Sequence, residues 1–369
     1  MVEAIRGLTT SGCRAIEDLA HRHLENRWHT GAQVAVYRDG ELQLEVRVGE
    51  AAGEEHRLLY FSATKPLVTI GVLTLIERGQ IELDTPLIQV WPEFGQGSKA
   101  DCTLRHVLTH QGGFPVFDRN FDWRQIDDWT AIVQSTAAIE AEWPPGTDTG
   151  YHPLTFGIVL GELIRRIDGR EPREFMQDEL FEPLGMKASI GITDRNLENQ
   201  IVLPIAMSEA TFDDPNGTEK RTSEIVSRFH LSSTLRAQLP AANAIGTAEA
   251  LARFYSMLER RWNDSDAFAG VCPLSRDLLR MATRVQNTVS VDRTSHLPAS
   301  YGLGFIVDGA FPPFNEPDVF GHGGQQSVIS YADPVRGLAV AYLTNGLQEP
   351  LTVQLRTEEM VTAVIEACR

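Results

Sequence analysis

The two ends of the chain carry the patterns of β-strands, whereas its middle carries those of helices. Residues 12–27 have apolar side chains at helical spacing and predict a surface helix. Two apolar, β-branched runs then flank Asp39-Gly40, a dipeptide typical of tight β-hairpins. Strand-like segments at 302–311, 318–334 and 337–347 precede a last helix from about Thr352 to Cys368. We therefore expect an antiparallel sheet assembled from both chain ends.

The middle of the chain predicts a second, mostly helical lobe. Residues 65–78 are apolar nearly all round, which indicates a buried helix. Three more helices are expected, at residues 103–111, 154–167 and 247–258. Residues 190–240 have weak periodicity and are interpreted as an irregular insertion. The prediction is one domain of α+β class, in which residues 1–60 and 290–369 form the sheet lobe and residues 61–289 the helical lobe.

The composition excludes several classes of partner. The 369 residues include 50 acidic and 33 basic ones, so the formal net charge of -17 argues against binding to nucleic acid. No segment reaches the roughly 20 apolar residues that span a bilayer, and the first twelve residues lack a secretory signal. The four cysteines lie far apart and predict neither a metal site nor a disulfide framework. We expect a cytoplasmic protein with reduced thiols and no membrane partner.

The first candidate for chemistry is Ser62-Ala63-Thr64-Lys65, at the start of the apolar helix. Residues three apart share a helix face, so the Lys65 amine can lie beside the Ser62 hydroxyl. Unpaired N–H groups at the helix start favour an anion there, and apolar surroundings would lower the pKa of Lys65. The pattern fits an activated serine nucleophile, although a capping serine followed by a solvated lysine gives the same spacing.

Two later segments are candidates for the same site. Tyr151 lies in a loop just before a predicted buried helix, where its phenol could exchange protons with Lys65 or simply pack. His322-Gly323-Gly324 lies on a predicted strand, and two glycines weaken a strand unless something approaches its backbone closely. A substrate carbonyl docked at that edge would supply the reason, while a bulge with a surface histidine is the alternative.

The order and spacing of these three segments resemble the superfamily of serine β-lactamases, penicillin-binding proteins and family VIII esterases. Further stretches are similar to it, among them TLRHVLTHQGGFP, PAANAIGTAEALARFYSML and FGHGGQQSVISYADPVRGLAVAYLTN. The resemblance implies a transpeptidase-like fold, a central antiparallel sheet flanked by helices. It also implies that Ser62 is the nucleophile, that Lys65 activates it, and that Tyr151 is a general base and proton donor. The backbone N–H groups of Ser62 and Gln325 would form the oxyanion hole, and whether Tyr151 or Lys65 takes the Ser62 proton stays open.

Two departures from the family pattern concern the substrate. The second motif ends in His152-Pro153 where an Asn or Ser is usual, so His152 either replaces that polar contact or packs. His322 and Gly323 stand in place of Lys and Thr, which removes a permanent cation and a hydroxyl that hold a substrate carboxylate. We expect a site for uncharged acyl groups, with His322 becoming charged only below about pH 6.5.

Aromatic residues between 112 and 129, including Phe114 and Trp123, either line an acyl pocket or pin the helical lobe to the sheet. The sequence thus favours a carboxylesterase that acts on small or medium uncharged esters without metal or cofactor. Three alternatives remain: an acyltransferase with the same mechanism, a β-lactamase or D-amino-acid peptidase, and a non-catalytic relative that only binds.

Overall fold

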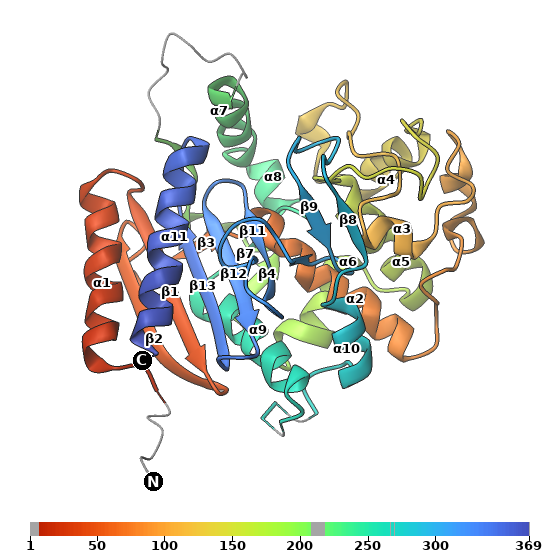
Figure 1. Cartoon of the computed structure of the whole chain (residues 1–369). Helices are drawn as coiled ribbons and strands as arrows, with labels where there is room; N and C mark the ends of the chain where they lie inside the picture. The colour runs from red at the N-terminus through yellow and green to blue at the C-terminus, as the bar shows by residue number, and fades with distance from the viewer. Residues whose placement is uncertain (1–6, 208–217, 266, 269, 369) are drawn as a thin grey trace.

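The computed structural model describes residues 7–207, 218–265, 267–268 and 270–368 (Figure 1). Its main sheet has the strand order β2-β1-β13-β12-β11-β10-β9-β8, and every neighbouring pair is antiparallel. The strands are β1 (Gly31–Arg38), β2 (Glu41–Gly49), β8 (Asn287–Val289), β9 (Ala299–Tyr301), β10 (Ile306–Val307), β11 (Phe320–Gly324), β12 (Val328–Asp333) and β13 (Leu338–Thr344).

The centre of this sheet joins the two ends of the chain, as the sequence predicts. β1 pairs with β13 over seven residues, from Ala32 opposite Thr344 to Arg38 opposite Leu338. The predicted hairpin between β1 and β2 is also confirmed. Asp39 and Gly40 both have positive φ, 51° and 87°, which gives the turn the twist that the flanking strands require.

Helices cover both faces of the sheet. α1 (Thr10–Glu25) and α11 (Pro350–Ala367) lie side by side on one face (Figure 1) and bury apolar side chains such as Leu19 and Met360 against the strands. α9 (Ala248–Trp262) packs on the other face, against β1, β12 and β13. Its N-terminus is capped by Thr247, whose hydroxyl accepts a hydrogen bond from Ala250 N–H, as the sequence predicts.

The remaining helices form the lobe beside α9. Its core is α2 (Lys65–Glu77), which is buried from Lys65 to Leu75 and packs against α5 (Thr155–Asp168). The other helices here are α3 (Leu104–Leu108), α4 (Trp129–Ala138), α6 (Pro172–Met176) and α10 (Arg276–Ala282). Shorter helical turns are η2 (Leu87–Gln89), η3 (Pro92–Gly95), η4 (Trp123–Gln125), η5 (Gln177–Phe181) and η6 (Arg195–Gln200). None of the helices in the described ranges combines the length and apolar character needed to cross a membrane.

The segment 190–240 is more regular than the sequence indicates. It contains α7 (Thr218–Phe229), α8 (Ser232–Arg236) and the strands β5 (Ile201–Val202) and β6 (Ile205–Ala206), while residues 208–217 lie outside the described part. β6 pairs in parallel with β14 (Gly346–Leu347). The expectation of an irregular insertion does not hold for α7 and α8; most residues of α7 are polar or charged, and the sequence analysis passed over their amphipathic arrangement.

A second, small sheet holds the turn from which Ser62 projects. Its order is β4-β7-β3-β5, with β4 (Ala188–Ile190), β7 (Ala244–Gly246) and β3 (Arg57–Leu59) as its other members. β3 leads directly into the 3₁₀ turn η1 (Phe61–Thr64), which α2 follows without a break. The nucleophile candidate is therefore fixed between a paired strand and the most deeply buried helix.

Candidate active site

The turn that carries Ser62 is strained and held from several sides. Phe61 has a φ of 47°, a conformation that costs a non-glycine residue about 1 kcal/mol or more. Tyr60 N–H donates to Ala244 O at 2.8 Å, and Ala244 N–H donates to the Thr64 hydroxyl at 3.1 Å. The Tyr60 hydroxyl also donates to Thr247 O at 2.7 Å. These contacts with β7 and the start of α9 keep Ser62 at the entrance of α2.

Lys65 brings a buried amine to the Ser62 hydroxyl. Its Nζ lies 3.3 Å from Ser62 Oγ, 2.9 Å from Pro153 O and 3.3 Å from Ala241 O. The Ala241 backbone can come this close because Gly157 on α5 has no Cβ, which would lie 2.3 Å from Ala241 N. No carboxylate of the described residues pairs with Lys65.

Burial lowers the pKa of Lys65 well below its usual value, so the neutral amine is favoured. A neutral amine has two N–H donors and one lone pair. The carbonyls of Pro153 and Ala241 can accept the two hydrogens, which leaves the lone pair for the Ser62 hydroxyl. This arrangement suits a base that removes the proton of Ser62.

Tyr151 lies on the other side of the same amine. Lys65 Nζ is 4.6 Å from the centre of the Tyr151 ring, and the His110 ring is 4.7 Å away. The Tyr151 hydroxyl is buried and has no partner with hydrogen-bond geometry among the described residues. Burial raises its pKa, and the nearby Ser62 hydroxyl opposes the rise only in part. The phenol therefore keeps its proton at neutral pH and can donate it.

Asp292 holds the backbone of Tyr151 in place through hydrogen bonds, a role that the sequence analysis missed. Its carboxylate is fully buried and accepts the Tyr151 N–H at 2.9 and 3.1 Å. It also accepts the N–H groups of the next loop residues, Thr294 and Ser295, at 2.8 Å and the Tyr301 hydroxyl at 3.0 Å. The only sequence signal was a single acidic residue in a polar loop, SVDRTS, about 140 positions from the tyrosine that it holds.

The strand β11 brings His322-Gly323-Gly324 to the nucleophile turn. A Cβ on Gly324 would lie 2.3 Å from Tyr60 O, so only glycine allows this approach. A Cβ on Gly323 would meet nothing closer than Val328 O at 3.5 Å, so this glycine leaves open space. Of the residues of β11, only Phe320 and Gly321 pair with β10. Within the described chain, the outer edge of β11 therefore has no strand partner from His322 onward.

Two backbone N–H groups complete the site. Gly324, Gln325, Gln326 and Ser327 form the turn between β11 and β12, closed by Ser327 N–H to Gly324 O at 2.8 Å. In the described part of the chain, neither Ser62 N–H nor Gln325 N–H donates to a protein atom. Free donors at both of these positions are what an oxyanion hole requires.

His322 differs from the expectation. It is only 4% exposed, and its ring centre lies 6.0 Å from that of Tyr151. Burial is the main cause that lowers the pKa of His322 to about 3. Protonation near pH 6.5 was therefore the wrong prediction. Nδ1 donates to Gly323 O at 2.6 Å, because a carbonyl can only accept, and this leaves Nε2 as an acceptor.

Two of the predicted substrate contacts are enclosed by protein. His152 and Phe114 are fully buried, and His152 Nε2 accepts the Phe114 N–H at 3.2 Å. In this arrangement both side chains pack inside the protein, and a contact of His152 or Phe114 with a substrate stays a prediction. Trp123 is half-buried, donates to the Thr234 hydroxyl at 2.9 Å and stacks under Arg228 of α7, so its substrate contact stays a prediction.

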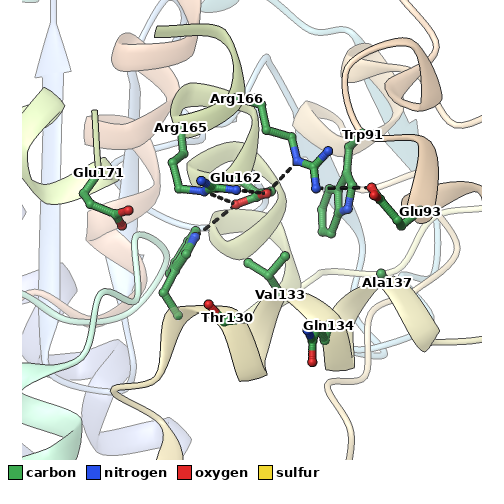
Figure 2. A pocket seen from close by; sticks show the side chains of 11 residues that line it. Trp91, Glu93, Thr130, Val133, Gln134, Ala137, Glu162, Arg165, Arg166 and Glu171 are labelled. Carbon is green, nitrogen blue, oxygen red and sulfur yellow. Dashed lines mark hydrogen bonds and ion pairs between the residues drawn. The ribbon is translucent and has the colours of Figure 1, made fainter. Parts of the chain in front are cut away.

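In the described part of the chain, no three His, Cys, Asp or Glu side chains cluster as metal ligands would. A cavity of about 310 Å³ lies elsewhere, between α4, α5 and η3 (Figure 2). Its centre is the carboxylate of Glu162, which accepts hydrogen bonds from Arg165, Arg166 and Trp129. None of its lining residues belongs to the Ser62 site.

The chain is similar to known proteins in both sequence and structure. The sequence of residues 16–363 matches the family described as Beta-lactamase. The chain belongs to this family. Relatives named as esterases match it as well, and the chain is a hydrolase of the beta-lactamase family.

Individual relatives agree over nearly the whole length. The chain is 30% identical to "Esterase/beta-lactamase LipL" of Mycobacterium tuberculosis, over 88% of this chain and 79% of that protein. A solved structure of a penicillin-binding protein homolog from Caulobacter crescentus is 26% identical, with a TM-score of 0.83 over 98% of this chain and 99% of the other. A family VIII carboxylesterase has the same fold, with a TM-score of 0.84 and 21% identity over 98% of this chain and 99% of the other. The α+β fold that the sequence predicts is confirmed.

Proposed function

We propose that this chain is a serine carboxylesterase that cleaves small or medium uncharged esters through an acyl-enzyme on Ser62. The observation that carries the proposal is the fully buried Lys65 amine 3.3 Å from Ser62 Oγ, next to the buried Tyr151 phenol. The esterase named among the relatives supports the same class of reaction. The proposal concerns catalysis; a cytoplasmic location and the lack of a nucleic-acid or membrane partner stay predictions from composition.

The proposed reaction has two balanced halves. The Ser62 proton passes to Lys65 as Oγ attacks the ester carbonyl, and the N–H groups of Ser62 and Gln325 bind the oxyanion. The C–O bond to the alcohol then breaks, and Tyr151 gives its proton to the departing oxygen while Lys65 re-protonates Tyr151. Water attacks the acyl-enzyme in the reverse sense and releases the acid.

The preference for uncharged acyl groups rests on His322 and Gly323. A histidine whose pKa is about 3 is neutral at every pH where the protein would work, so it offers no cation to a carboxylate. The open space at Gly323 leaves no hydroxyl there to bind one. Penicillins and D-alanyl peptides both carry that carboxylate, which is why an ester is the better substrate.

The test is covalent labelling combined with turnover. A fluorophosphonate should add one label to the intact protein, mass spectrometry should place it on Ser62, and Ser62→Ala should take none. Nitrophenyl butyrate should be hydrolysed and nitrocefin hardly at all, and Ser62→Ala should lose activity by about a thousandfold or more. A label on another residue would refute the nucleophile, and nitrocefin turnover equal to that of the ester would refute the esterase assignment.

A further inference from the structure

Arg356 is a buried cation without an acid partner. It lies on α11, is 2% exposed, and pairs with no carboxylate of the described residues within 4.0 Å. Burial lowers its pKa. Burying a charge without a counter-ion costs free energy, so the contacts that Arg356 does make should have a function.

Its guanidinium connects three distant parts of the chain through their backbone carbonyls. Nη1 donates to Trp28 O at 3.0 Å and to Gly346 O at 3.2 Å. Nη2 donates to Gln326 O at 2.5 Å. Trp28 lies in the turn between α1 and β1, and Gly346 begins β14, which pairs with β6, whereas Gln326 belongs to the turn that presents Gln325 N–H to the active site.

That turn needs external support. Gln326 has a φ of 56°, which glycine adopts freely and a glutamine adopts only at a cost of about 1 kcal/mol. Its side chain contacts Thr222 of α7, with 3.3 Å between Oε1 and the hydroxyl. If Gln326 relaxed to negative φ, the peptide planes of the turn would rotate and the Gln325 N–H would leave the oxyanion position.

We propose that Arg356 is a positioning residue for the oxyanion hole: it fixes the strained Gln325-Gln326 turn to the frame formed by Trp28 and Gly346. The proposal rests on the function proposed above, because it assigns Gln325 N–H to the oxyanion. Arg356 touches no reacting atom. The planar guanidinium group holds the carbonyls of Gly346 and Gln326 at a fixed separation. A lysine has a single ammonium group, which cannot bridge both carbonyls in the same way.

The first test compares Arg356→Met and Arg356→Lys with wild type. Both should lower kcat for nitrophenyl butyrate by about tenfold to a hundredfold with little change in KM, since the donor is misplaced rather than removed. The carbonyl stretch of the acyl-enzyme, followed by rapid-mixing infrared spectroscopy with a slowly deacylating cinnamoyl ester, should move to higher frequency. That shift reports weaker hydrogen bonding to the acyl oxygen.

The decisive test is a rescue. Gln326→Gly removes the need to hold a glutamine at positive φ, so the double variant Arg356→Met/Gln326→Gly should recover kcat to within about threefold of Gln326→Gly alone. Its carbonyl band should return toward the wild-type frequency. A residue that serves only the fold, or only supplies charge, would not be replaced by a glycine 30 positions away.

The matched control is Arg173 on α6. It also has no acid partner within reach and donates to backbone carbonyls, including Ile190 O at 2.5 Å and Ala237 O at 3.1 Å. Arg173→Met should lower the melting temperature but leave the carbonyl band in place.

Four outcomes would overturn the proposal: kcat within twofold of wild type in Arg356→Met, an unshifted band, no rescue by Gln326→Gly, or loss of fold in both Arg356 variants. A wild-type protein that shows no ester carbonyl band on Ser62 would instead refute the proposed function.

Discussion

The chain contains two buried clusters of ionisable side chains with opposite character. Around Glu162, four hydrogen bonds from Arg165, Arg166 and Trp129 reach one carboxylate (Figure 2), and Arg166 also pairs with Glu93 at 3.2 Å. Around Ser62, by contrast, no acid of the described residues pairs with the Lys65 amine, and none of them gives the Tyr151 hydroxyl a partner with hydrogen-bond geometry.

The two clusters differ in the charge state that burial leaves. Burial alone would raise the pKa of Glu162, but the hydrogen bonds from Arg165 and Arg166 outweigh it, so its pKa is lowered and the carboxylate stays charged. No carboxylate of the described residues pairs with Lys65, so burial lowers its pKa well below the usual value and favours the neutral amine. Buried charges whose hydrogen bonds are satisfied are thus typical of a structural cluster. A buried base and a buried acid without such partners indicate a site of proton transfer.

The largest effect should come from removing the unpaired base. Lys65→Met should lower kcat for nitrophenyl butyrate by about a thousandfold or more, because it removes the proposed acceptor of the Ser62 proton. Stability should respond with pH in a defined direction. The unfolded lysine binds a proton up to about pH 10.5, whereas the folded one does not, so wild-type stability rises with pH across the range between the two pKa values.

Thermal unfolding of wild type and Lys65→Met from about pH 7 to about pH 10 checks this prediction. The melting temperature of wild type should gain on that of the variant as the pH rises. A constant difference would mean that Lys65 is charged in the folded protein, and the contrast with Glu162 would disappear.

Tyr151→Phe should have the next largest effect. We expect kcat for an alkyl ester to fall by about a hundredfold to ten-thousandfold with KM nearly unchanged, since the lost proton donor acts in the transition state. A nitrophenyl ester, whose leaving group needs little protonation, should lose much less. Equal losses on both esters would show that Tyr151 supports the site in another way.

Glu162→Gln should affect stability and spare catalysis. It leaves two partly exposed arginines without their carboxylate and should cost about 2 kcal/mol in unfolding free energy, measured by urea titration. Glu93→Gln is the matched control, because Glu93 is 60% exposed and should cost well under 1 kcal/mol. A drop in kcat for folded Glu162→Gln would contradict the division between the two clusters.

The smallest effect concerns His322. Because its pKa is about 3, lowering the pH from about 8 to about 5 should not charge the ring. The ratio of kcat/KM for a carboxylate-bearing ester to that for a neutral ester should therefore stay constant over this range. A ratio that rises as the pH falls through 6.5 would show that His322 binds a proton there and serves as an anion anchor.

Much of this site could be predicted from the sequence because its chemistry is local. Ser62 and Lys65 are three residues apart, and the helix that follows them is apolar on all sides, so both the contact and the desolvation follow from the pattern. The glycines of β11 likewise indicated a close approach to the strand backbone. The structure places Tyr60 O where a side chain of Gly324 would be.

The rest depends on contacts between distant segments. Asp292 accepts a hydrogen bond from Tyr151, which lies 141 positions away in the sequence, and Arg356 donates one to Gln326 O. The turn that contains Gln326 has no periodic pattern in the sequence that would indicate this contact. The burial of His322, which changes its charge behaviour, is set by the packing of α2, β11 and the Tyr151 loop together. Propensity and spacing carry no information about such encounters, which is why the pH expectation for His322 was wrong.

The pairing of β1 with β13 has a consequence for the way this chain is made. Ala32 and Thr344 become neighbours only after all the residues between them have been synthesised. Until then, the edge of β1 that will pair with β13 has no strand partner. Such an unpaired edge can form hydrogen bonds with strands of other chains. Closure over so long a loop is also slow. Charged residues along β2, such as Glu41, Glu45 and Arg47, oppose such joining along the other edge of the hairpin during that interval.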